Sequence, residues 1–104
     1  KLGLYNAIFH DRTLPEALAA IKAAGLTGIE LNTGGFLPAT HIPTIDDILV
    51  SDDARDEFLG IFEGTGVDIY GLNCNGNPLH PNKAIGDKHA EDIRRSIRLA
   101  ERLG

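Results

Sequence analysis

The sequence has little of what defines several large classes of protein. Its 104 residues include one cysteine, Cys74, which cannot form an internal disulfide, so nothing indicates an oxidising compartment. No apolar run approaches the ~20 residues that span a bilayer, and no basic segment precedes an apolar one as in a signal peptide. We therefore expect a cytoplasmic protein with no membrane partner.

Positive charge is also scarce, with ten Lys and Arg against fifteen Asp and Glu and a formal net charge of -5. Binding a phosphate backbone needs a basic surface, so the composition argues against nucleic acid as a partner. Methionine is absent, the chain starts at Lys1, and it ends at Gly104 just after a helical pattern. These features favour a segment of a longer protein.

Apolar segments of two kinds alternate along the chain. Continuous short runs predict buried strands, and runs with apolar residues three and four apart predict amphipathic helices. Thr13 and Glu16 have the spacing of a capping box, while Ser51 and Asp87 are expected to cap the later helices. Six elements are predicted, with strands over residues 2–9, 28–31 and 67–72 and helices over residues 14–24, 52–63 and 88–103.

The strand and helix units repeat at about 40 residues, which predicts parallel strands with helical crossovers. Three parallel strands leave two open edges, whereas eight such units close into a barrel. An open dinucleotide-binding sheet is the competing fold, but no glycine-rich turn follows Phe9. We predict an α/β fold of the (β/α)₈ TIM-barrel type, with residues 1–104 forming its first three units. Pairs 41 residues apart are Gly25 and Gly66, Leu31 and Leu72, and Asn32 and Asn73.

Two long loops, 33–50 and 74–86, follow predicted strands, and loops of this length are uncommon unless they are functional. Glu30 stands inside an apolar strand, where it could bind a hydroxyl, a cation or a proton, or pair with a Lys or Arg of a neighbouring strand. Asparagines could bind sugar-like hydroxyls or serve turns, and a tyrosine could lie at the same rim or in the core. The candidate substrate-binding residues are Tyr5, Glu30, Asn32, Asn73, Asn75 and His80.

The four histidines do not have the spacing of a zinc site. His80 is the best candidate for a substrate or metal role, because it lies in the polar loop after the third predicted strand. His10 and then His41 are weaker candidates, and His89 is expected on the surface of a helix. Cys74 is expected to pack in the interior rather than to act as a nucleophile.

The order of these segments resembles the sugar phosphate isomerase/epimerase family, the xylose isomerase-like TIM barrels. The resemblance implies a divalent metal (Mn, Mg, Co or Zn), a small sugar or polyol substrate, and a proton moved next to a carbonyl. It also implies that the main metal ligands lie beyond Gly104, so the 104 residues alone should be inactive. The segments that carry it are Leu2-Gly3-Leu4-Tyr5, Ala23-Ala24-Gly25, Gly28-Ile29-Glu30-Leu31, Gly76-Asn77-Pro78-Leu79-His80-Pro81 and Leu99-Ala100-Glu101-Arg102-Leu103-Gly104.

Two alternatives stay open. One is an endonuclease-IV-like zinc barrel acting on damaged DNA, which would need more histidines at the strand ends and a basic mouth. The other is a non-catalytic fragment of three units that associates with further copies through its open edges, as a homo-oligomer.

Overall fold

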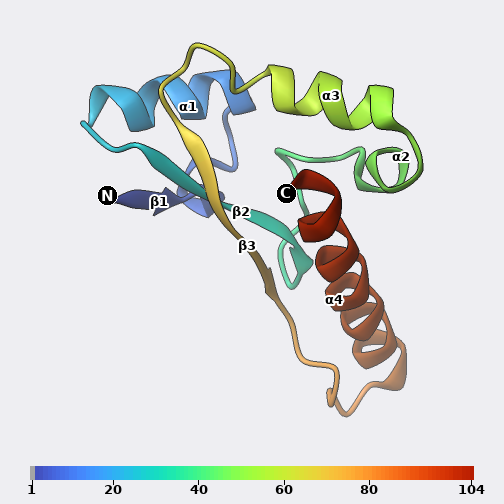
Figure 1. Ribbon diagram of the computed structural model, residues 1–104. Coiled ribbons are helices and arrows are strands. Elements are labelled where there is room, and N and C mark those ends of the chain that lie inside the picture. The colour runs from blue at the N-terminus through green and yellow to red at the C-terminus, as the bar shows by residue number, and fades with distance from the viewer. Residues whose placement is uncertain (1) are drawn as a thin grey trace.

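Three parallel strands lie side by side in chain order in the computed structural model, which describes residues 2–104 (Figure 1). The chain is therefore α/β, as predicted. The strands are β1 (Gly3–Tyr5), β2 (Gly28–Gly35) and β3 (Asp68–Asn75), and the helices are α1 (Leu14–Ala23), α2 (Ile45–Val50), α3 (Asp52–Gly60) and α4 (Lys83–Leu103).

The internal repeat is visible as strand register. Leu31 pairs with Leu72 and Asn32 with Asn73 across β2 and β3, so residues 41 apart in sequence are neighbours in the sheet. Both strand pairs are parallel, as the alternation of strands and helices predicts. The repeat therefore has a structural basis: each unit places equivalent residues on adjacent strands.

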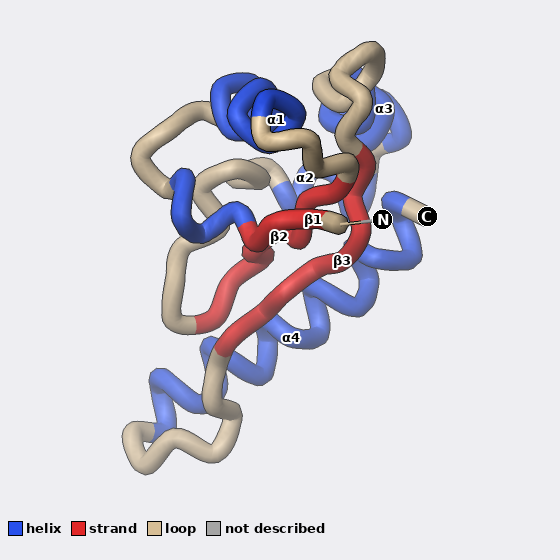
Figure 2. The backbone as a smooth tube through the Cα atoms, turned by 90° about the vertical axis from the view of Figure 1, so that its left-hand side faces the viewer, coloured by secondary structure: helices blue, strands red, loops and turns tan. Residues whose placement is uncertain are grey.

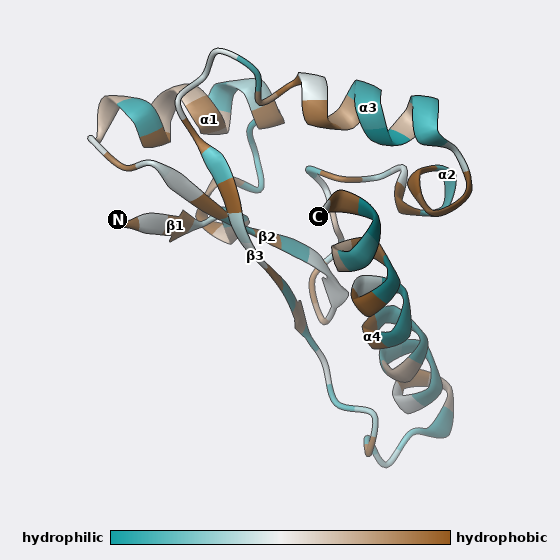
Figure 3. Cartoon of the chain, viewed as in Figure 1, coloured by the Kyte–Doolittle hydropathy of each residue, from teal (hydrophilic) through white to brown (hydrophobic). Residues whose placement is uncertain are grey.

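One hydrophobic core lies between the sheet and the helices. Ile29 and Leu31 point from β2 into it and are fully buried. Apolar and polar stripes alternate around α4, and its apolar stripe turns toward the sheet (Figure 3). Side chains from every helix reach this core: Leu14, Leu18 and Ile21 of α1, Ile45 and Ile48 of α2, Phe58 of α3 and Leu99 of α4.

The predicted local signals at the ends of α1 and α3 are confirmed. Thr13 and Glu16 form both hydrogen bonds of a capping box, and the Ser51 hydroxyl accepts from the Ala54 N–H. Gly25 follows α1 with a φ of 80°, the left-handed conformation that ends many helices. The predicted helix over 52–63 is shorter than expected, because regular α3 stops at Gly60 and turns follow.

The predicted strand over 2–9 is wrong in its second half. Strand β1 stops at Tyr5, and Asn6–Phe9 forms a 3₁₀ turn. The side-chain oxygen of the buried Asn6 accepts from the Asn32 N–H within β2, so residue 6 bonds to β2 through its side chain and not as part of the β1 ladder, and Ile8 is 62% exposed. The hydrophobic pattern of residues 2–9 therefore did not reveal the 3₁₀ turn that begins at Asn6.

Helix α4 starts five residues before the predicted start, and Asp87 is not its cap. The Asn82 side chain accepts from the N–H groups of Ala84 and Ile85 instead. Gly86 does not interrupt the helix. A side chain there would lie 2.8 Å from the Pro78 carbonyl oxygen, so glycine allows the preceding loop to pack on the first turn.

The loop predicted over 33–50 contains regular structure. Strand β2 continues to Gly35, four residues beyond its predicted end, and α2 occupies Ile45–Val50. The extension pairs Gly34 with Cys74 and Gly35 with Asn75, because β3 also runs three residues past its predicted end. The two extensions place the polar ends of the strands farther along the chain than the sequence suggests.

Strand β3 is an edge of the sheet, and a groove of about 880 Å³ runs along it toward α3 and α4. Leu72, Ile93 and Ile97 line the groove, and Ile97 is 66% exposed. Among residues 2–104, none of the helices is long and apolar enough to cross a membrane. Figure 2 shows β3 at the open side of the sheet, with the segment between β3 and α4 extending away from it.

Candidate functional site

A row of side chains crosses the face of the sheet that points away from the core. Tyr5 pairs with Glu30, and Glu30 pairs with Gly71, so the three positions are adjacent across β1, β2 and β3. Side chains alternate along a strand, and Ile29 and Leu31 point into the core. Glu30 therefore points to the other face, where Gly71 leaves space for its side chain.

Glu30 is held by a neutral partner. The Asn73 Nδ2 donates to Glu30 Oε1 at 2.7 Å, and no Lys or Arg of residues 2–104 forms an ion pair with this carboxylate. Within residues 2–104 the alternative of a Lys or Arg on a neighbouring strand therefore has no support. A carboxylate bound by one amide keeps acceptor capacity for a hydroxyl or a proton. The Glu30 carboxylate, held by Asn73, is thus the group of this row that can still bind a hydroxyl or accept a proton.

Tyr5 lies beside this pair in the register, with a hydroxyl that is closed to solvent and has no hydrogen-bond partner within residues 2–104. Burial raises the pKa of this phenol, and the neighbouring Glu30 carboxylate and Cys74 add to the effect. Tyr5 is therefore a neutral donor that lacks an acceptor. An unpartnered buried hydroxyl costs stability, so its position beside Glu30 needs a functional or assembly-level reason.

The other predicted binding residues do not join this row. Asn32 is 4% exposed, and its side chain donates to the Leu37 and Pro38 carbonyls and accepts from the Gly34 N–H. Asn32 therefore serves the turn that follows β2, the structural role left open at the sequence level.

Asn75 and His80 are also apart from the row. Asn75 is exposed at the end of β3, where its backbone carbonyl accepts from the Phe36 N–H. His80 lies in the segment between β3 and α4, and its Nδ1 accepts from the Asn82 N–H. This segment extends away from the sheet in Figure 2, so His80 is not placed with Glu30.

The prediction that His89 lies on the surface is wrong. It is 3% exposed, its Nδ1 accepts from the Asn77 N–H at 2.8 Å, and its ring packs edge-on against Phe36. It also lies where any side chain at residue 76 would be, so Gly76 allows the loop to pass closely over the ring. His89 anchors the loop after β3 to α4.

Two sets of buried polar groups have roles that the sequence analysis did not predict, and the first includes His41, which was a weak candidate for a substrate or metal role. His41 accepts from Asn6 through Nδ1 at 2.7 Å, and its Nε2 donates to the Arg12 carbonyl at 2.8 Å. Asn6 also accepts from the Asn32 N–H at 2.7 Å. One linked set of hydrogen bonds thus joins the residue after β1, the middle of β2 and the loop before α2. Asn6 stands inside the apolar run predicted as a strand over 2–9, and a polar residue within such a run was the available signal.

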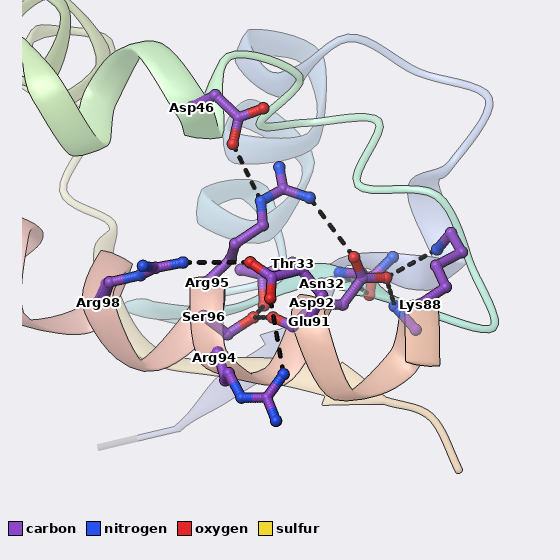
Figure 4. A network of polar contacts seen from close by, with 12 residues as sticks. Asn32, Thr33, Asp46, Lys88, Glu91, Asp92, Arg94, Arg95, Ser96 and Arg98 are labelled. Atoms are coloured by element: carbon purple, nitrogen blue, oxygen red, sulfur yellow. Dashed lines mark hydrogen bonds and ion pairs between the residues drawn. The ribbon is translucent and has the colours of Figure 1, made fainter. Parts of the chain in front are cut away.

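The second buried group is Asp92, shown in Figure 4, whose side chain is 7% exposed. Its Oδ2 accepts from the Gly35 N–H at 3.0 Å and from Lys88 at 2.7 Å, while Arg95 approaches its Oδ1. Burial raises the pKa of this carboxyl, but the bonds from Lys88 and Gly35 outweigh it, so the net pKa is lowered. Asp92 therefore fixes the end of β2 to α4 as an anion.

Cys74 contacts the same region of α4. It is partly buried, and burial raises the pKa of its thiol against the opposing effect of a hydrogen bond with Ser96. A thiol with a raised pKa is a poor nucleophile, which agrees with the packing role that we expected. No group of three or more His, Cys, Asp or Glu side chains within residues 2–104 could hold a metal ion.

The chain is 36% identical over 80 residues to a protein of Bacillus subtilis (strain 168) described as "Uncharacterized protein YfiH". The match covers 77% of this chain and spans about a quarter of the length of that relative. No protein-family model matches the chain. No solved structure matches it either.

Proposed function

We propose that the chain is the N-terminal part of a (β/α)₈ TIM barrel of the sugar phosphate isomerase/epimerase family. Three parallel strand–helix units in chain order support this proposal, as does the pairing of β2 with β3 between residues 40 or 41 apart in sequence. The groove along β3 supports it further, because the apolar side chains of Leu72, Ile93 and Ile97 line it beside a strand that has no partner on that side within residues 2–104. A fourth unit would cover the apolar surface left there.

The proposed activity of the whole barrel is that of a metal-dependent isomerase or epimerase, moving a proton next to the carbonyl of a sugar or sugar phosphate. The observation that carries this is the Glu30–Asn73 pair on the open face of the sheet. Glu30 Oε1 is held by the amide, and Oε2 has no hydrogen-bond partner within residues 2–104. In this proposal Oε2 accepts the proton or a substrate hydroxyl, and Tyr5 donates a hydrogen bond beside it.

The described residues do not form a binding site for a divalent metal. Glu30 is the one carboxylate in the row, and residues 2–104 contain no group of three possible ligands. A divalent metal needs several oxygen or nitrogen ligands, so we derive no step through it. The metal remains a property proposed for the whole protein.

Proton exchange tests the proposal. We expect a source polypeptide of roughly 250–350 residues, the ordinary size of such barrels, which intact mass will establish. In that polypeptide, wild-type protein should exchange a sugar C–H for deuterium in D₂O, followed by ¹H NMR. Glu30→Gln should slow exchange by about 10²-fold or more, because an amide is a much weaker base.

The matched control is Glu57→Gln, at an exposed carboxylate on α3. It should leave the exchange rate unchanged. An exchange rate in Glu30→Gln equal to that of wild type would remove Glu30 from the mechanism. A source polypeptide that ends at Gly104 would contradict the barrel.

The same groove favours one second candidate, a non-catalytic fragment that associates with further copies through β3. Ile97 and Tyr70 are 66% and 44% exposed beside an unpaired strand edge, which is a surface typical of association. Light scattering at increasing concentration separates the two. A mass that rises with concentration together with an absence of proton exchange supports association over catalysis.

A further inference from the structure

A chain of three hydrogen bonds runs from β2 through two buried side chains to the segment before α1. Asn6 Oδ1 accepts from the Asn32 N–H at 2.7 Å, and Asn6 Nδ2 donates to His41 Nδ1 at 2.7 Å. His41 Nε2 in turn donates to the Arg12 carbonyl at 2.8 Å. Asn6 is 2% exposed and His41 is 5% exposed, so solvent does not compete for these bonds. The chain thus ties the ring of His41, in the loop between β2 and α2, to the strands.

The two ends of this chain fix the state of the His41 ring. The Asn32 N–H can only donate, so the Asn6 oxygen must face it and the Asn6 NH₂ must face His41. The Arg12 carbonyl can only accept, so His41 Nε2 carries a proton. His41 Nδ1 is then an acceptor without a proton, and the ring is the neutral Nε2–H tautomer.

A second proton on the ring upsets the balance of donors and acceptors. In the neutral state the N–H groups of Asn32, Asn6 and His41 Nε2 are three donors for three acceptors. Protonation turns Nδ1 from an acceptor into a donor, which leaves four donors and two acceptors. Turning the Asn6 amide does not help, because its NH₂ would then face the Asn32 N–H. A buried donor without an acceptor is costly, above all on a charged group, so the protonated ring cannot keep its place beside Asn6.

No carboxylate is in place to accept the added proton. Within residues 2–104, neither an ion pair nor a hydrogen bond joins His41 to a charged side chain. Of the five carboxylates on the surrounding elements, three accept from other groups and the remaining two are exposed. The titratable or charged side chains of these elements are Tyr5 of β1, His10, Asp11 and Arg12 before α1, Glu16 and Lys22 of α1, Glu30 of β2, and Asp46 and Asp47 of α2.

We propose that His41 is an acid-sensitive latch for residues 39–44, the second part of the loop between β2 and α2. The neutral ring fastens this segment to Asn6 and, through Asn6, to β2. When the ring takes a second proton, its bond to Asn6 breaks and the segment is released. Histidine is the side chain that ordinarily gains this proton between about pH 8 and pH 5. The latch concerns the conformation of the loop and does not depend on the proposed activity.

The first part of the same loop is fastened independently of His41. The Asn32 side chain donates to the Leu37 and Pro38 carbonyls, and the Phe36 N–H donates to the Asn75 carbonyl. None of these groups gains or loses a proton in the range where histidine titrates. Residues 36–38 therefore serve as an internal reference for any change in residues 39–44.

NMR relaxation of the ¹⁵N-labelled source polypeptide at about pH 7.5 and about pH 5 tests the latch. At the higher pH, the backbone order parameters of residues 39–41 should be near the rigid value of about 0.85, and at the lower pH they should fall below about 0.6. Those of residues 36–38 should change little. Order parameters of residues 39–41 that are equal at the two pH values would overturn the proposal.

His41→Asn separates the latch from a general effect of acid. The Asn side-chain oxygen can still accept from Asn6 where Nδ1 does, but the side chain has no proton to gain in this pH range. The loss of order at the lower pH should therefore disappear. The matched control is His10→Asn, at an exposed histidine close to the same segment, and it should keep the wild-type response. A wild-type response in His41→Asn would assign the effect to another group and remove the latch.

Asn6→Asp should reverse the response, and it decides the question even if His41→Asn does not fold. The two Asp oxygens can accept from the Asn32 N–H and from a protonated Nδ1, so donors and acceptors balance only with the charged ring. Residues 39–41 should then stay ordered at the lower pH. The midpoint of the ring titration, followed by ¹⁵N shifts, should rise above that of wild type by about one pH unit or more. A midpoint equal to or below that of wild type would contradict the latch.

Discussion

The two faces of strand β2 have opposite tasks. On one face Ile29 and Leu31 are fully buried beneath the helices, and Thr33 bonds to Ser96 of α4. On the other face Glu30 is partly exposed, with one amide partner. The buried face supplies folding energy, so the open face is left free to carry groups that would be costly in the core. Alternation along one strand is enough to separate stability from chemistry.

The largest difference in the free energy of unfolding is expected between substitutions at two adjacent positions, one on each face of β2. Leu31→Ala should lower the free energy of unfolding by about 2–5 kcal/mol, because it leaves a cavity in a core with no solvent access. Glu30→Gln should change it by about 1 kcal/mol or less, since the amide can still accept from Asn73. Urea denaturation measures both. Similar costs at the two positions would contradict the division of faces.

Asp92 gives a second comparison with Glu30, because the Asp92 carboxylate is buried whereas the Glu30 carboxylate is partly exposed. Asp92→Asn should cost about 1–3 kcal/mol at neutral pH, as the bonds from Lys88 and the Gly35 N–H lose their charge. The folded pKa of Asp92 is lowered, so its stabilisation is complete above the unfolded pKa of about 4 and disappears as pH falls through the lower folded value.

Urea denaturation between pH 7 and pH 2 measures this effect. Wild type should lose stability below about pH 4 more steeply than Asp92→Asn. The exposed Asp52 also has a lowered pKa, caused first by its hydrogen bond with Arg102, but added salt should screen that contribution. Parallel acid curves for wild type and Asp92→Asn at high salt would show that Asp92 contributes nothing.

A small effect is also expected at a second position of the open face, where Tyr70 covers Gly28. A Cβ at Gly28 would lie 2.0 Å from Tyr70 Cδ2, so Gly28→Ala must displace a ring that is 44% exposed and bonded to Thr27. We expect a cost of about 1 kcal/mol, the low end for overpacking, because the ring can move into solvent. Thermal unfolding of the double variant Gly28→Ala, Tyr70→Ala should show this cost removed. A full cost in the Tyr70→Ala background would place the strain in the backbone instead.

The features that the sequence predicted depend on residues close together in the chain or on the repeat. The features that it missed depend on contacts between residues far apart in sequence. The expectation that Glu30 lies on a polar face needed only alternation along one strand, and the pairing of Asn32 with Asn73 needed only the repeat. The role of Asn32 required its carbonyl partners in the next turn. His80 was favoured because of its loop, but loop membership does not specify where that loop lies.

The sequence by itself determined the local features of this protein: the capping box at Thr13, the left-handed glycine at Gly25, the amphipathic helices and the spacing that sets parallel register. Each depends on residues within a few positions, or on a repeat that can be aligned with itself. Only the tertiary structure decided that Asn6 bonds to β2, that Asp92 holds Gly35, and that His41 bonds to Asn6 and to the Arg12 carbonyl. A polar side chain takes its role from the partner that folding brings to it, and neither the type of the residue nor its neighbours in sequence specify that partner.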